Sequence, residues 1–129
     1  MFPLSKDKTK YMKITEAYVE CSKINDTEIL IIDPKALTFL SQKAFHDVSH
    51  LLRKSHLQQL KDILDDKEAS QNDHFVALTM LKNANVSSSG VLPMCQDTGT
   101  AIILGYKGEK VFTDSDDGKY LSLGVYNTY

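Results

Sequence analysis

The sequence is short of arginine, and this limits the sites that it can form. Of its 15 basic residues only Arg53 is an arginine. Carboxylates and phosphates are usually bound by the planar guanidinium group of arginine through two parallel hydrogen bonds, so a site for such a ligand would lack most of its binding groups here. The net charge of −2 gives no basic surface, so we expect no nucleic-acid partner.

Cysteine and long hydrophobic runs are also scarce. Two cysteines, Cys21 and Cys95, do not make a disulfide framework, which favours a reducing, intracellular compartment. We expect the cytoplasm, with mitochondrial import as the alternative. No apolar run reaches the roughly 18 residues of a membrane span, so we expect no membrane partner. A content of 42% hydrophobic and 25% charged residues excludes collagen-like and disordered chains.

The first part of the chain predicts a β-hairpin followed by a helix. Residues 1–17 are polar and form a lead-in to the folded part, residues 18–129. Two short apolar stretches flank Asn25-Asp26, and Asn and Asp suit a turn. Asp33-Pro34 then supplies a capping side chain and a first-turn proline, and apolar residues follow at helical spacing.

The middle of the chain predicts two more helices. One begins near Ser55 and ends at Asp65-Asp66. The other opens at Ser70-Gln71-Asn72-Asp73, which resembles a capping box with Asp in place of Glu, and ends near Asn85. These two helices and the one after Asp33 make a three-helix group.

The last part predicts a second hairpin and a further helix. Residues 100–104 read as a buried strand, Lys107-Gly108 as a turn and Val111-Phe112 as the returning strand. Asp114–Gly118 reads as a polar loop, and a helical pattern begins at Leu121. The predicted fold class is α+β: an N-terminal β-hairpin, a three-helix group, and a second β-hairpin with the loop around Cys95 at its start.

Three possible ligand sites are better explained by ordinary structure. His46 and His50 have the spacing of a zinc pair on a helix, with Asp47 where metalloproteases carry Glu, but no third ligand is evident. We interpret them as structural or surface histidines. Asp114–Gly118 fails the calcium-loop pattern because Val125 stands where a bidentate Glu is needed. Residues 105–108 lack the G-K-S/T ending of a phosphate loop.

The segment Pro93-Met94-Cys95-Gln96-Asp97-Thr98-Gly99-Thr100 is a stronger candidate. It joins a predicted helix to a predicted strand, which is a common place for functional groups. A thiol, an amide, a carboxylate and a hydroxyl follow one another directly. From the residues alone, Cys95 is compatible with a metal or cluster ligand, a nucleophile, or a buried hydrophobic residue.

This segment, continued through Ala101, resembles the cluster-binding loop of class I fumarases. These are [4Fe–4S] hydro-lyases related to tartrate dehydratase. The similarity extends over about residues 30–129. The motifs that carry it are residues 44–53, 56–60, 63–66, 72–73, 75–78, 81–85 and 124–126. Together they are far more specific than the loop alone.

The resemblance implies a role for each residue of the loop. Cys95 would be one of three cysteine ligands to a [4Fe–4S] cluster, in which the iron without a thiolate acts as a Lewis acid on the substrate. Gln96 would hydrogen-bond a substrate carboxylate, and Asp97 would bind substrate and transfer a proton. Thr98 and Gly99 would shape the loop. The implied reaction is the reversible hydration of fumarate to (S)-malate.

The resemblance also implies that this chain is incomplete. Class I fumarases are much longer, and the other cluster ligands and the carboxylate-binding arginines lie in the part that is not present. We therefore expect the N-terminal portion of a hydratase that is a homodimer when intact, and no activity from these residues alone. The alternatives are the α portion of a tartrate or other 2-hydroxy-acid dehydratase, and a truncated paralogue acting as an interaction module.

Overall fold

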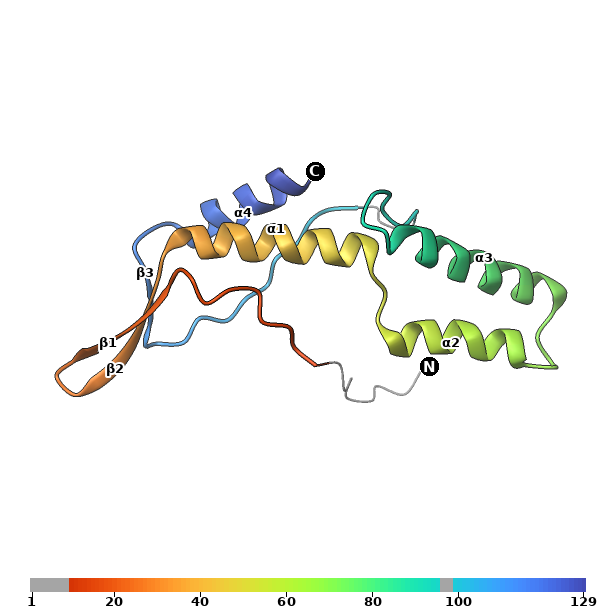
Figure 1. Ribbon diagram of the computed structural model, residues 1–129, viewed down its shortest axis with the longest axis horizontal. Helices are drawn as coiled ribbons and strands as arrows, with labels where there is room; N and C mark the ends of the chain where they lie inside the picture. Colours follow the sequence, from red (N-terminus) through yellow and green to blue (C-terminus); the bar gives the residue numbers. More distant parts are fainter. Residues whose placement is uncertain (1–9, 96–98) are drawn as a thin grey trace. The chain divides into compact units, whose positions relative to one another are not determined.

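The computed structural model describes residues 10–95 and 99–129. Its elements are β1 (Val19–Ile24), β2 (Thr27–Ile32), α1 (Pro34–His50), α2 (Lys54–Asp65), α3 (Gln71–Ser87), β3 (Val111–Thr113) and α4 (Asp117–Thr128) (Figure 1). The chain divides into two compact bodies. We call residues 48–95 the helical-hairpin body, and residues 13–47 with 99–129 the sheet body. Helices together with one sheet confirm the predicted α+β class.

The N-terminal hairpin forms as predicted. Strands β1 and β2 pair antiparallel, from Val19 opposite Ile32 to Ile24 opposite Thr27. Asn25 and Asp26 make the turn with φ of 46° and 61°, and two positive φ values in a two-residue loop match the right-handed twist of the strands. Residues 10–17, the described part of the predicted lead-in, contain no helix or strand.

The second hairpin is not formed, so that prediction is wrong. Strand β3 pairs with β2 in parallel, Leu30 opposite Val111, and the sheet order is β1-β2-β3. Residues 100–104 have no strand partner within the described chain, and Ile102 and Leu104 are 80% and 85% exposed. An apolar segment becomes a strand only where another strand satisfies its backbone groups, and residues 100–104 pair with neither outer strand of this sheet.

Helix α4 starts earlier than the apolar pattern indicated. Asp116 caps it by accepting hydrogen bonds from the backbone N–H groups of Gly118 and Lys119. The predicted polar loop 114–118 therefore ends inside the first helical turn, because an Asp cap satisfies the free N–H groups there. Asp117 in that turn accepts hydrogen bonds from Lys107 and from Thr113 of β3, which ties the preceding loop to the helix.

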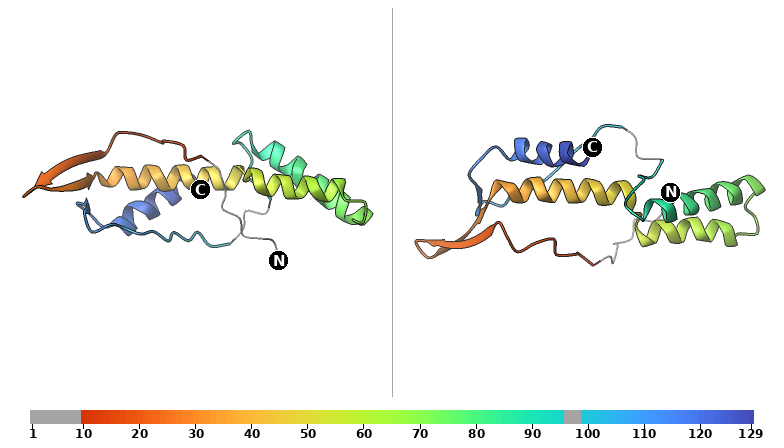
Figure 2. Two further views of the ribbon diagram at one scale, coloured as in Figure 1. Left: turned by 90° about the horizontal axis from the view of Figure 1, so that it is seen from below. Right: turned by 45° about the horizontal axis from the view of Figure 1, so that its top comes forward.

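Within the sheet body α4 lies alongside α1 (Figure 2). Three hydrogen bonds join the two helices, each from a hydroxyl to a backbone carbonyl: Thr38 to Tyr120 at 3.0 Å, Ser41 to Leu121 at 2.9 Å, and Thr128 to Gln42 at 3.1 Å. Gly124 is the buried residue of α4, and it faces Ser41, which is also buried. Small residues at the crossing let the two backbones approach closely.

In the helical-hairpin body α2 and α3 run side by side (Figure 1). The predicted capping box at Ser70 is confirmed: its hydroxyl accepts the backbone N–H of Asp73 at 3.2 Å, and the Asp73 carboxylate accepts the Ser70 N–H at 3.0 Å. Hydrogen bonds from the Ser70 side chain and backbone hold the pKa of Asp73 below its ordinary value. Helix α3 runs two residues beyond the predicted end, to Ser87.

Few hydrophobic side chains are fully covered. Those buried within the described residues are Leu60, Ala77, Ala84 and Met94, all in the helical-hairpin body. Large apolar side chains stay exposed on several elements, for example Phe75 at 68% and Tyr126 at 79%. No helix in the described part of the chain is long and apolar enough to cross a membrane.

Candidate functional site

The chain turns sharply after α3 and carries the cysteine loop back toward the end of α1. Gly90 adopts φ of 74°, a conformation that favours glycine, and its N–H donates to the Ser87 carbonyl at 2.9 Å. Pro93 follows and prevents the helix from resuming. Both residues keep the helix from continuing, and the chain then brings Met94 back against the end of α1.

The loop is anchored on backbone carbonyls at the end of α1. The Met94 N–H donates to the Ser49 carbonyl at 2.8 Å, and the Ser87 hydroxyl donates to the His50 carbonyl at 3.0 Å. The final carbonyls of a helix lack partners within it, so these bonds satisfy groups that would otherwise be orphaned. Ser49 is 3%, Ser87 0% and Met94 7% exposed, so the anchor is buried.

Cys95 lies directly beyond this anchor with its thiol accessible. Its backbone N–H donates to the Asn83 side-chain oxygen at 3.3 Å, while the residue itself is exposed and forms no disulfide. The interpretation of Cys95 as a buried hydrophobic residue is therefore wrong. No hydrogen bond joins its thiol to a residue of the described ranges 10–95 and 99–129.

The remaining predicted site residues are placed only in part. Gln96, Asp97 and Thr98 lie outside the described residues. Gly99 has φ of 109°, where a residue with a side chain would be strained. Cys21, the other thiol, lies exposed on β1 opposite Leu30. The described residues hold no group of three or more His, Cys, Asp or Glu side chains suited to a metal ion.

Asp47, which lies between the two histidines of the predicted pair, is bound by side chains of its own helix. Lys43 donates to the Asp47 carboxylate at 2.7 Å, and His46 Nδ1 lies 3.3 Å from the same oxygen. Burial acts to raise the pKa of Asp47, but the hydrogen bonds and charges of Lys43 and His46 outweigh it and hold that pKa below its ordinary value. Asp47 is thus engaged within its own helix. His50 is buried.

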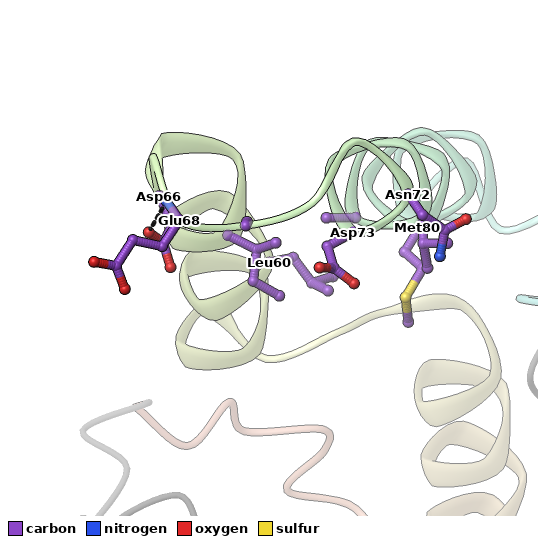
Figure 3. Close-up of a pocket in the computed structure, with 10 residues that line it drawn as sticks. Leu60, Asp66, Glu68, Asn72, Asp73 and Met80 are labelled. Carbon is purple, nitrogen blue, oxygen red and sulfur yellow. Dashed lines mark hydrogen bonds between the residues drawn. The ribbon is translucent and has the colours of Figure 1, made fainter.

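A cavity of about 450 Å³ lies between α2 and the N-terminal half of α3 (Figure 3). Its walls include Leu60, Ala77 and Met80, and the carboxylates of Asp66 and Asp73 lie at its edge. Asp73 is occupied by the Ser70 cap and Asp66 accepts the Glu68 N–H at 2.9 Å. These carboxylates serve the local turn, whereas the cysteine loop attaches at the other end of α3, so the cavity is not the candidate site.

Sequence comparison decides which protein family this site belongs to. A family model described as Fumarate hydratase (Fumerase) matches residues 39–129, which include the whole cysteine loop. The chain belongs to the fumarate hydratase family. It is 53% identical over 128 residues to the aerobic class I fumarate hydratase of Escherichia coli (strain K12), covering 99% of this chain and 23% of that protein.

Other fumarate hydratases match over nearly the same part. Fumarate hydratase 1, mitochondrial, of Leishmania major is 54% identical over 128 residues, covering 98% of this chain and 23% of that protein. Fumarate hydratase 2 of the same organism is 47% identical over 123 residues, covering 94% and 22%. The chain thus spans about 23% of the length of these relatives. The resemblance seen in the sequence is confirmed at the level of the family.

Asn83 and Ser49 lie within the motifs of the resemblance, but neither they nor Ser87 were predicted to have a role in the site. Asn83 and Ser87 are four residues apart, so they lie on one face of α3. Asn83 accepts the Cys95 N–H, and Ser87 binds the end of α1, which also holds Met94. Polar residues at helical spacing, close in sequence to a functional loop, are the signal that points to such anchors.

Proposed function

We propose that this chain forms part of a [4Fe–4S]-dependent class I fumarate hydratase and contributes Cys95 as one thiolate ligand of the cluster. The observation that carries the proposal is the position of Cys95: an exposed, free thiol on a backbone held by buried helix-end hydrogen bonds, in a chain of the fumarate hydratase family. Soft thiolate ligands on a fixed backbone suit an iron–sulfur cluster.

This chain can supply one of the several ligands that such a cluster needs. An accessible thiol can reach a group supplied from outside the two helices. When bound, a cluster with one iron free of thiolate supplies Lewis acidity toward a hydroxyl and a carboxylate. The remaining steps fall to side chains of the protein.

In this proposal Gln96 donates hydrogen bonds to a substrate carboxylate and Asp97 moves the proton beside the reacting carbons. Both assignments rest on the motif, in which they follow Cys95 directly. The substrate is a small dicarboxylate, fumarate in one direction and (S)-malate in the other. The proposal includes a homodimeric enzyme in the cytoplasm or the mitochondrion.

We further propose that these 129 residues are inactive on their own. A single thiolate does not hold a four-iron cluster, and one arginine does not clamp two carboxylates. The exposed apolar side chains on α3 and α4 also favour a fold that is completed by further protein.

The test is fumarate hydration by a polypeptide of the relatives' full length that carries this sequence, reconstituted under argon with ferrous iron and sulfide. Asp97→Asn should keep the cluster absorbance and lower kcat by about 10²-fold, the usual scale for loss of an acid–base group. An unchanged rate would remove Asp97 from the mechanism. Turnover of tartrate in place of fumarate would favour the dehydratase alternative, and hydration by the 129-residue chain alone would contradict its proposed inactivity.

A further inference from the structure

The side chain of Asn83 reaches from α3 to the backbone of Cys95. Its amide oxygen accepts the Cys95 N–H at 3.3 Å, across 12 residues of sequence. Asn83 is half-buried on a helix whose next turn carries Ser87, the buried residue that binds the end of α1. The amide therefore lies one turn from a buried hydrogen bond that joins α3 to the end of α1.

Two successive backbone N–H groups before the thiol are held in different ways. The Met94 N–H is bound to the Ser49 carbonyl in a buried position, and this bond attaches the loop to the body. The Cys95 N–H is bound only to the Asn83 side chain among the described residues. Without Asn83 the loop would stay attached at Met94, but the peptide group of Cys95, and with it the direction of the Cα–Cβ bond, would be free to rotate.

We infer that Asn83 is a positioning residue: it fixes the backbone of Cys95 so that the thiolate is presented to the cluster in one direction. The inference rests on the proposed function, in which Cys95 is a ligand. A ligand held in its bound direction before binding loses less freedom when the metal binds. Partners of this kind, which orient a ligand without touching the metal, typically change metal affinity by 10–100-fold when removed.

Iron release separates this role from a merely structural one. The full-length holoenzyme carrying Asn83→Ala should lose iron to an excess of EDTA about tenfold faster than wild type. Ala is the better helix former, so the substitution does not weaken α3 through helix propensity. Asn83→Asp keeps an acceptor oxygen at the same place and should restore slow release. Asn85→Ala, an exposed amide two residues along the same helix, is the matched control.

The outcomes of this experiment separate the role of Asn83 from the role of Cys95. Fast release from Asn83→Ala, with slow release from Asn83→Asp and Asn85→Ala and equal thermal unfolding midpoints, supports the inference. If Asn83→Ala releases iron as slowly as wild type while Cys95→Ser holds no cluster, the inference is overturned and Cys95 remains a ligand. If Asn83→Asp loses iron as fast as Asn83→Ala, the acceptor role is also overturned. A Cys95→Ser protein with a normal cluster would overturn both.

Discussion

Replacing Gly124 with alanine tests how closely α1 and α4 pack. A Cβ atom built on Gly124 lies 1.9 Å from the Ser41 hydroxyl and 2.3 Å from the Thr38 carbonyl oxygen. The hydroxyl can rotate away only by giving up its bond to the Leu121 carbonyl. The Thr38 carbonyl is backbone, so a separation of even 3.0 Å requires the helices to move apart by about 0.7 Å. That movement would stretch all three hydrogen bonds between α1 and α4.

The expected loss in the free energy of opening α4 combines three contributions: overpacking, weakened hydrogen bonds and helix propensity. Overpacking costs about 1–3 kcal/mol, and each weakened hydrogen bond up to about 1 kcal/mol more. The higher helix propensity of alanine returns about 1 kcal/mol. We expect the free energy of opening α4 to fall by about 2 kcal/mol, which corresponds to roughly 30-fold faster amide hydrogen exchange. The exchange is measured by mass spectrometry on peptides from α4.

Gly118→Ala is the matched control for this substitution. Its added Cβ meets one atom, a carboxylate oxygen of Asp116 at 3.3 Å, in an exposed first turn. Exchange in α4 should stay within about threefold of wild type for this variant. If Gly124→Ala exchanged as slowly as Gly118→Ala, the close packing of α1 on α4 would be refuted.

Two further predictions concern the loop that leads out of the site. Hydrogen bonds from Lys107 and Thr113 hold the pKa of Asp117 below its ordinary 3.8. These bonds therefore stabilise the folded state fully above pH 3.8, and the stabilisation is lost as the pH falls through the lower pKa of the folded state. Asp117→Asn should therefore flatten the fall of the urea midpoint below about pH 4, and an unchanged profile would contradict the assignment. Gly99→Ala should cost about 1–3 kcal/mol because its φ is 109°, whereas Gly105→Ala, with open space and no positive φ, should not. Equal urea midpoints for the two variants would show that Gly99 carries no strain.

Local signals explain why the hairpin and the helices were predictable. The turn at Asn25-Asp26, the Asp33 side chain that accepts the Lys35 N–H, and the reciprocal Ser70–Asp73 bonds each join residues within three positions of one another. Hydrogen bonds and turns between residues so close in the chain can be predicted from the sequence alone. The same holds for the αL turn at Gly90, which redirects the chain toward the cysteine loop.

Non-local pairing explains what was not predictable. The segment 100–104 has the composition of a strand, but it becomes one only where another strand pairs with it. Its predicted partner, Val111-Phe112, pairs with β2 instead. The parallel pairing joins Leu30 to Val111, 81 positions apart, and no short pattern encodes it. In the site, the motif pointed to Cys95, but its contact with Asn83 depends on how the loop folds back on α3.

The role of Cys95 is tested most directly by Cys95→Ser in a polypeptide of the relatives' length that carries this sequence. Wild type and variant are reconstituted anaerobically with iron and sulfide, and the cluster absorbance and the rate of fumarate hydration are recorded together. Cys21→Ser, which removes the other exposed thiol, is the control and should match wild type in both. We expect Cys95→Ser to lose the cluster absorbance and the hydration activity together. A Cys95→Ser protein that keeps both would contradict it.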